Sequence, residues 1–147
     1  MKRLPAIMLL TVFLIASCTR EKKVVEESYP DGSPKRVCIY RGNGDDRQLM
    51  RETTYYPGKK VKMDGNYKNN QRDGQWTYWY ENGTKWSEGF FRDGKNEGRR
   101  LTYFENGRIR YEAYYNNGNR VGKWKFYDVK GRLLQVVDYD APANAGK

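Results

Sequence analysis

The chain has 147 residues, of which 37% are hydrophobic and 15% aromatic, and its formal net charge at pH 7 is +10. It contains no histidine, which excludes histidine-based catalytic triads and most catalytic zinc sites. Leucine and isoleucine are scarce after residue 20, whereas the chain has 13 tyrosines. We therefore expect many small aromatic contacts in place of a thick hydrophobic core.

Residues 1–17 have the pattern of a secretory signal peptide. A basic start, Met1-Lys2-Arg3, precedes an apolar stretch at 9–16 that is too short to span a membrane. Small residues then lead directly to Cys18, an ending that resembles a bacterial lipobox. That resemblance implies cleavage before Cys18 and its acylation by palmitate-type chains. The alternative is an ordinary signal peptide with an incidental cysteine.

An acylated Cys18 predicts a lipoprotein of the bacterial cell envelope. Two or three acyl chains make membrane attachment practically permanent. Thr19, not aspartate, follows the cysteine, so we expect the outer rather than the inner membrane. Removal of residues 1–17 takes away Lys2 and Arg3 and lowers the formal charge from +10 to +8. Residues 18–27 then form the lipidated cysteine and a polar, charged tether.

The segment after the tether reads as a degenerate opening unit. Turn signals at 29–32 and 40–44 flank a short strand pattern that contains Cys38. With Cys18 acylated, Cys38 cannot form a disulfide with it, and it is most simply a half-buried strand residue. A redox or intermolecular role is the alternative. Terminal units of repeat arrays are often atypical because they cap the stack.

A 24-residue repeat runs through most of the remaining chain. Six positions within the repeat recur at this spacing without an insertion. Four of these sets are Gly74, Gly98 and Gly122; Gly83, Gly107 and Gly131; Gly65, Gly89 and Ala113; and Tyr67, Phe91, Tyr115 and Tyr139. A fixed period of this length is typical of stacked supersecondary units that cannot bury their apolar faces alone.

Each unit is predicted to be a β-hairpin. Alternating aromatic residues precede Asn82-Gly83, a sequence that favours a two-residue type I′ turn. A second turn at Asp93-Gly94 passes the chain to the next unit. The two-residue turn would place Tyr80 opposite Lys85, Tyr78 opposite Ser87 and Trp76 opposite Gly89. On the other face, Trp79 would lie beside Trp86, and Tyr103 beside Arg110.

These hairpins predict an all-β fold, namely an extended, twisted antiparallel sheet that is largely single-layer. The repeat domain should span residues 28–140, with clear repeats at 53–139. Residues 141–147 are small and polar, and we expect them to be disordered.

One ionisable feature follows the repeat. Asp64, Glu88 and Glu112 are 24 residues apart and would form a row on one face. The row is a conceivable calcium or substrate site. The favoured interpretation is that each carboxylate pairs with a nearby lysine or arginine, for example Lys62 or Arg110. No catalytic residue and no cofactor is predicted.

Exposed rings on a single-layer sheet often mark an interface. The candidate binding surface predicted from the sequence consists of Trp79, Trp86, Tyr103, Tyr127 and Arg110. Alternatively, these rings only pack against neighbouring units. The excess of lysine and arginine either keeps the sheet soluble or attracts anionic lipid or glycan. A nucleic-acid partner does not fit an exported lipoprotein.

The residues 73–83, continuing through 87–95, resemble the bacterial variant of the MORN (membrane occupation and recognition nexus) repeat. Asp64-Gly65-Asn66-Tyr67 and Val121-Gly122-Lys123-Trp124 match its other recurring pieces, while Arg100 stands where tryptophan is expected. Bacterial proteins of this kind are often catalogued as YwqK-type antitoxins, and many are lipoproteins. The resemblance implies arrays of β-hairpins that bind protein or lipid without catalysis.

Together these patterns favour a lipid-anchored, non-enzymatic envelope protein that uses its repeats as a protein-binding or scaffold module. One alternative is an antitoxin or immunity protein that neutralises a cognate toxin. Another is a binder of anionic lipid headgroups or envelope glycans, whose affinity should fall with added salt.

Overall fold

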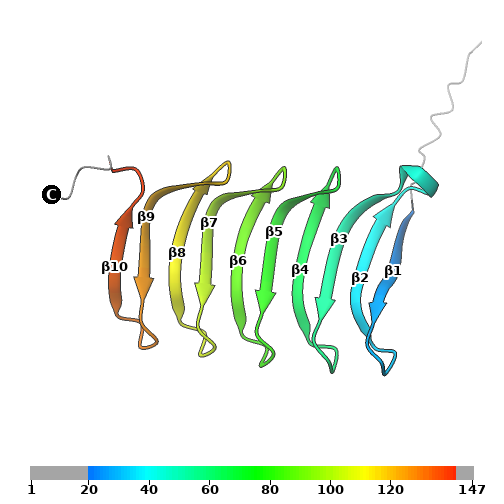
Figure 1. The fold of residues 1–147 in the computed structure, drawn as a ribbon, viewed down its shortest axis with the longest axis horizontal. Helices are drawn as coiled ribbons and strands as arrows, with labels where there is room; N and C mark the ends of the chain where they lie inside the picture. Colours follow the sequence, from blue (N-terminus) through cyan, green and yellow to red (C-terminus); the bar gives the residue numbers. More distant parts are fainter. Residues whose placement is uncertain (1–19, 142–147) are drawn as a thin grey trace, which may run out of the picture.

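The computed structural model describes residues 20–141, which form one open antiparallel sheet of ten strands (Figure 1). The strands are β1 (Glu21–Ser28), β2 (Pro34–Arg41), β3 (Gln48–Tyr55), β4 (Val61–Lys68), β5 (Gln71–Trp79), β6 (Lys85–Arg92), β7 (Lys95–Tyr103), β8 (Ile109–Asn116), β9 (Asn119–Tyr127) and β10 (Leu133–Asp138). The predicted all-β, repeated-hairpin fold is confirmed.

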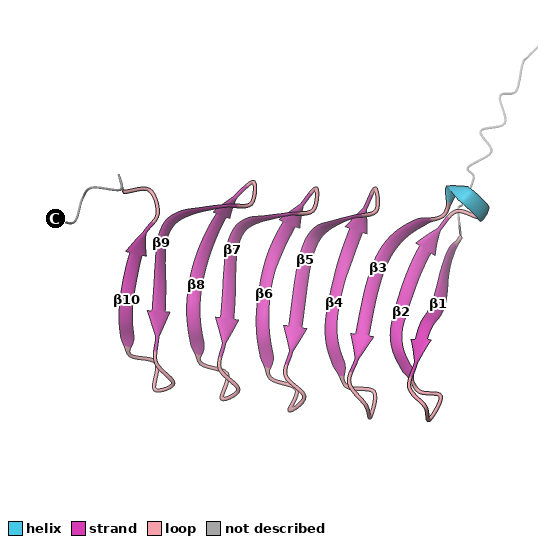
Figure 2. Cartoon of the chain, in the orientation of Figure 1, coloured by secondary structure: helices cyan, strands magenta, loops and turns pink. Residues whose placement is uncertain are grey.

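Every strand pairs with its neighbours in the chain, so the order across the sheet is the order in the sequence. The only helical element in residues 20–141 is one 3₁₀ turn, Gly44–Asp46, between β2 and β3 (Figure 2). Accordingly, that part of the chain contains no helix of the length and apolarity needed to cross a membrane.

The two-residue turn lies at Asp93-Gly94 and not, as predicted, at Asn82-Gly83. Asp93 and Gly94 both have positive φ, 48° and 78°, and Arg92 pairs directly with Lys95, which makes this connection the two-residue type I′ turn. At Asn82-Gly83 only the glycine has positive φ, 89°. The side chain of Asn82 instead accepts a hydrogen bond from the Thr84 N–H at 2.8 Å. This local bond holds asparagine outside the left-handed region and produces a longer loop.

The longer loop changes the register at one end of each hairpin. Trp76 pairs with Gly89 and Tyr78 with Ser87, as predicted. Trp79, however, pairs with Lys85, so the predicted pairing of Tyr80 with Lys85 is wrong. Trp86 is the extra residue of a β-bulge. The same bulge recurs in four units, where the extra residues are Lys62, Trp86, Arg110 and Leu134.

Side chains alternate between two faces of the sheet. We call one the tryptophan face, which carries Trp76, Phe91, Arg100, Ala113 and Trp124. The other is the carboxylate face, which carries Asp64, Glu88 and Glu112. Predicted cross-strand neighbours on the tryptophan face are confirmed, because Arg100 pairs with Ala113 and Trp124 with Val137.

Burial on the tryptophan face comes from rings that lie across small residues. Trp76 is fully buried in a single-layer sheet because Gly65 leaves room for its ring, and a methyl group at Gly65 would overlap that ring. Tyr67 and Phe91 pack edge-on at centroid distances of 5.2 and 5.8 Å. The indole N–H donates to the Asn66 carbonyl oxygen at 3.0 Å. The ring is therefore held by apolar and polar contacts together.

Trp124 forms the equivalent cluster two units later. Tyr139 and Tyr115 lie at centroid distances of 4.8 and 5.2 Å from it, and its indole N–H donates to the Tyr114 carbonyl oxygen at 3.1 Å. Between the two clusters, Arg100 replaces tryptophan and bonds Asn96 Oδ1 at 2.6 Å.

The hairpin loops at one end of the sheet are tied to each other by tyrosine hydroxyls. Tyr56 donates to the Trp79 carbonyl oxygen at 2.9 Å, and Tyr80 donates to the Tyr103 carbonyl oxygen at 2.9 Å. Tyr29 makes the corresponding bond to Tyr55 at 2.8 Å. Each bond joins one unit to the next, so the units depend on their neighbours.

One continuous line of directly paired residues crosses all ten strands on the carboxylate face. Its members, in order, are Val25, Val37, Thr53, Asp64, Thr77, Glu88, Leu101, Glu112, Lys125 and Val136.

The sheet begins earlier than the sequence predicted. Residues 21–27, assigned to the tether, belong to β1. The carboxylates of β1 form ion pairs with arginines of β2: Glu21 with Arg41 at 2.7 Å and Glu27 with Arg36 at 2.9 Å. Cys38 is fully buried, not half-buried. Residues 1–17, Cys18 and the predicted tail at 142–147 lie outside the described part of the chain.

Candidate binding surfaces

The five residues of the predicted binding surface do not share a face. Successive side chains of a strand point to opposite faces, and this alternation places Trp79, Tyr103 and Tyr127 on the carboxylate face. The bulge gives β6 and β8 one extra residue, which turns Trp86 and Arg110 to the opposite side. The predicted contact of Trp79 with Trp86 is therefore replaced by an edge-on contact of Trp86 with Tyr78, at a centroid distance of 5.7 Å.

One depression near the C-terminal end of the array has a volume of about 460 Å³. Its lining includes two of the predicted residues, Arg110 and Tyr127, although their side chains belong to opposite faces; the other lining residues are Phe104, Tyr111, Phe126, Asp128 and Leu134. The Arg110 guanidinium lies over the Phe104 ring at 5.8 Å from its centroid. This cation–π contact holds the arginine against the sheet.

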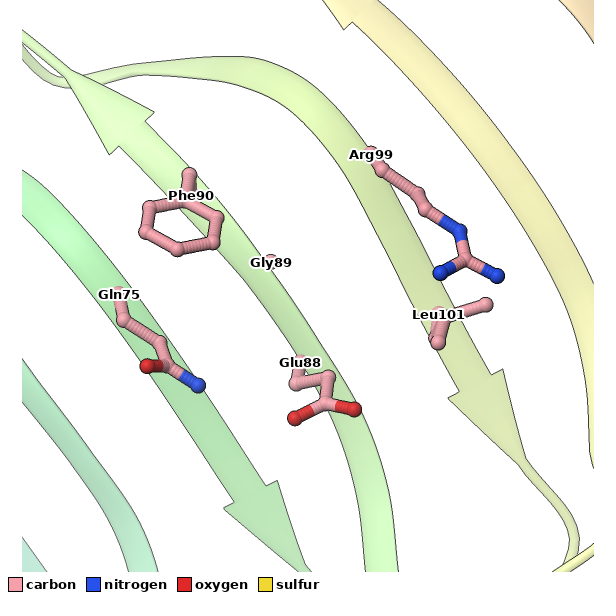
Figure 3. A pocket seen from close by; sticks show the side chains of 6 residues that line it. All are labelled: Gln75, Glu88, Gly89, Phe90, Arg99 and Leu101. Carbon is pink, nitrogen blue, oxygen red and sulfur yellow. The ribbon is translucent and has the colours of Figure 1, made fainter.

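A second depression lies on the carboxylate face and was missed by sequence reasoning. It has a volume of about 280 Å³ and is lined by Gln75, Glu88, Gly89, Phe90, Arg99 and Leu101. Figure 3 shows these side chains arriving from three adjacent strands, β5, β6 and β7. Phe90 is 52% exposed. The depression therefore presents an uncovered ring beside an amide, a carboxylate and a guanidinium.

Alternation in β6 explains why Phe90 is exposed. Phe91 packs on the buried side of the strand against Trp76, so its neighbour Phe90 must point to the other face. The 24-residue equivalents of Phe90 are Asn66, Tyr114 and Asp138. A phenylalanine at a position that is otherwise polar or amphipathic was the signal in the sequence that could have identified this site.

Each carboxylate in the row forms an ion pair with an arginine or lysine and accepts a hydrogen bond from a hydroxyl group. Arg51 binds Asp64 at 2.6 Å, Lys85 binds Glu88 at 2.8 Å, and Arg99 binds Glu112 at 2.6 Å. The favoured interpretation of the row, local ion pairing, is confirmed, although the partners are not the Lys62 and Arg110 named from the sequence. In residues 20–141, no three Cys, Asp or Glu side chains converge in a way that would hold a metal ion.

The hydrogen bonds around the row also shift its pKa values. The bond from Lys85, followed by one from Tyr103 at 2.5 Å, lowers the pKa of Glu88. Burial opposes ionisation of Glu112, but bonds from Tyr114 and Arg99 outweigh it and lower the pKa of that carboxyl. Burial and the bond to Glu88 raise the pKa of Tyr103 to about 12. Both carboxylates are thus charged and satisfied at neutral pH.

Three consecutive segments, residues 49–69, 72–93 and 96–117, match the family model of the MORN repeat variant. Each of these segments is similar to the MORN repeat variant. The matched segments correspond to the hairpins β3–β4, β5–β6 and β7–β8. The search of curated proteins returned no match. MORN repeats suggest a module that binds protein or membrane, and the family is generally a non-enzymatic binding or scaffold module.

Proposed function

We propose that this chain is a lipid-anchored, non-enzymatic protein of the bacterial envelope whose MORN-variant repeats bind a protein partner. The observation that carries the proposal is Phe90, a half-exposed ring at the mouth of the carboxylate-face depression. Free energy is gained when a partner's apolar side chain covers this ring, because burial removes apolar surface from water.

The surroundings of Phe90 match the anatomy of a protein interface. Gln75 offers an amide, and Arg99 an exposed guanidinium already held by Glu112. A central aromatic anchor with a polar rim is the arrangement in which a few residues dominate binding. Because Arg99 is already held by Glu112, its side chain loses little conformational entropy when a partner binds.

Anchoring is supported by the sequence of residues 1–17 and the cysteine that follows them. The test is the full chain with Cys18→Ala, expressed with its own leader. Loss of the acyl mass and release from the membrane fraction are the expected results. If the variant stays membrane-bound to the same extent, the lipid anchor is wrong.

The binding surface is tested by placing a photo-crosslinking amino acid at Gln75 in the full chain. We expect one discrete protein adduct, lost on Phe90→Ser and kept on Trp86→Ser. Trp86 is the matched control because it is also a partly exposed ring, 43%, but on the opposite face. Equal loss in both variants, with native circular dichroism, would contradict a specific role of Phe90.

The same experiment separates the partner classes. A single adduct that proves to be a toxin identifies the protein as an immunity protein, a special case of the proposal. Adducts that contain only lipid or glycan and disappear with added salt replace the proposal with binding to an anionic surface, which the positive net charge favours.

A further inference from the structure

The two outermost strands of the sheet differ from the eight inner ones. Within residues 20–141, the outer side of β1 and the outer side of β10 pair with no strand. Such edges present a row of backbone N–H and C=O groups that can join another strand. Natural proteins usually guard them with lysine, proline or a bulge.

β10 has an apolar edge. Its sequence, Leu133–Asp138, contains neither lysine nor proline. Its bulge, at Leu134, lies at the start of the strand, and the pairing from Gln135 to Asp138 is regular. Leu134 is 66% exposed and Val136 is 46% exposed. On the opposite edge of the molecule, Val25 of β1 is 51% exposed. Each edge therefore leaves at least one β-branched side chain uncovered.

The repeat specifies which strand fits against β10. β4, β6 and β8 are the return strands of their hairpins, and each pairs on its far side with the first strand of the next unit. β10 is also a return strand, and β1 is the first strand of the first unit. A strand of the β1 kind, running antiparallel, is what the array would place beside β10.

We propose that the sheet continues between molecules, with β10 of one copy pairing antiparallel with β1 of a second copy. The register follows from the continuous line of paired residues that crosses the sheet. That line starts at Val25 and ends at Val136. Continued by one strand, it places Val136 opposite the second copy's Val25.

The neighbouring positions in this register are complementary. Val137 meets the second copy's Val24, and both lie on the tryptophan face. Asp138 meets the second copy's Lys23, an opposite charge. Within its own chain Asp138 has one distant ion pair, with Lys123 at 3.9 Å. Branched side chains opposite each other and paired opposite charges both favour strand pairing.

The contact is heterologous, because it joins two different edges of the molecule: the β10 edge of one copy and the β1 edge of the next. A heterologous contact that does not close generates a row of molecules. The inference is independent of the proposed partner site, since Phe90 lies on a central strand and not at an edge.

The test uses disulfide trapping in cells that make two differently tagged full-length copies. One copy carries Val25→Cys and the other Val136→Cys, and mild oxidant is added to the membranes. Directly opposite strand residues have Cα atoms about 4.5–5.5 Å apart, within reach of a disulfide. The expected result is a mixed covalent dimer that is absent from the unsubstituted parent, and a ladder of larger species from one copy with both substitutions.

Glu21→Cys paired with Val136→Cys is the matched control. Glu21 is on the same edge and face as Val25 but is four residues out of register, roughly 13 Å away. Trapping with Val25→Cys should exceed trapping with this control several-fold. Equal trapping, no trapping, or a dimer formed by Val136→Cys alone, which would mean two-fold pairing of β10, would overturn the inference.

A disrupting variant gives a second readout. Val136→Lys places a charge opposite the second copy's Val25 and should remove species larger than the monomer in detergent sedimentation, with unchanged circular dichroism. If the large species persist in a folded Val136→Lys variant, β10 is not the contact. If that variant does not fold, the trapping experiment decides alone.

Discussion

On adjacent residues of one strand, Phe91 is buried while Phe90 is half exposed. Phe91 belongs to the tryptophan face, where rings from β4 to β6 surround Trp76. Phe90 belongs to the carboxylate face, where it shares a depression with Gln75, Glu88, Arg99 and Leu101. The difference shows that the two faces of a single-layer sheet can be built differently. One face forms a core from rings that lie over glycine, and the other leaves a ring such as Phe90 exposed.

The largest expected effect comes from removing the core ring. Trp76→Ala should destabilise the fold by about 3–5 kcal/mol, because it leaves a cavity and deletes the contacts of a fully buried ring. Phe90→Ala should cost under about 1 kcal/mol, since about half of the residue is already exposed to water. Urea unfolding followed by circular dichroism measures both, and similar costs for the two would refute the contrast between the faces.

A matched pair of glycines tests how the rings are accommodated. Gly65→Ala should destabilise by about 1–3 kcal/mol, because its methyl group overlaps the Trp76 ring, which has no room to move. At Gly89 a Cβ would lie 3.2 Å from Cγ of Arg100, an unbranched side chain that can shift. Gly89→Ala should therefore cost clearly less. The order of the two thermal midpoints decides the point, and a reversed order would show that Arg100 is the more rigid neighbour.

The carboxylate face predicts a dependence of stability on pH. Glu88 and Glu112 have lowered pKa values in the folded state. Their contribution is thus present above the unfolded-state pKa, near 4.5, and is lost as pH falls through the folded-state values. Each should contribute under about 1 kcal/mol. The free energy of unfolding should be measured from pH 7 to pH 3 in the parent and in the double variant Glu88→Gln, Glu112→Gln. The double variant should show a weaker dependence on pH, and an unaltered pH profile would contradict the prediction.

The smallest expected effect lies in the loops. Asn82→Ala removes the bond to the Thr84 N–H and a long one from Asn82 Nδ2 to the Glu105 carbonyl oxygen at 3.4 Å. Both are exposed, so the cost should be at the low end for a hydrogen bond, about 0.5 kcal/mol. Asn106→Ala, whose equivalent bond to Val129 is 3.0 Å, should cost at least as much. Differential scanning calorimetry checks the ranking, and no change in either variant would mean that the loops hold their shape without these side chains.

Much of the fold could be predicted from the sequence because the 24-residue glycine spacing reports directly on hairpins and their order. The pairing of Trp76 with Gly89 was predicted from a two-residue turn at Asn82-Gly83, and it is correct because the bulge at Trp86 offsets the longer loop. The turn at Asn82-Gly83 could not be predicted, because the choice between turn types depends on a hydrogen bond from the Thr84 N–H to the side-chain oxygen of Asn82.

That single misassigned turn also explains why the predicted site was split. A loop one residue longer shifts the register, and a bulge then carries Trp86 and Arg110 to the other face. β1 was missed for a different reason: its charged side chains, such as Glu21 and Glu27, resemble a solvated tether until their partners on β2 are known. Composition alone does not reveal pairing between strands.

Because each strand pairs only with its neighbours in the chain, hairpin contacts form between residues close in sequence. Such a topology has a low contact order for a β-protein, which favours fast folding from any hairpin that forms first. It also allows the number of repeats to change. Duplication or loss of one 24-residue segment leaves every remaining strand with a neighbour of the same kind, so the array can lengthen or shorten by whole units while each surviving hairpin keeps its geometry.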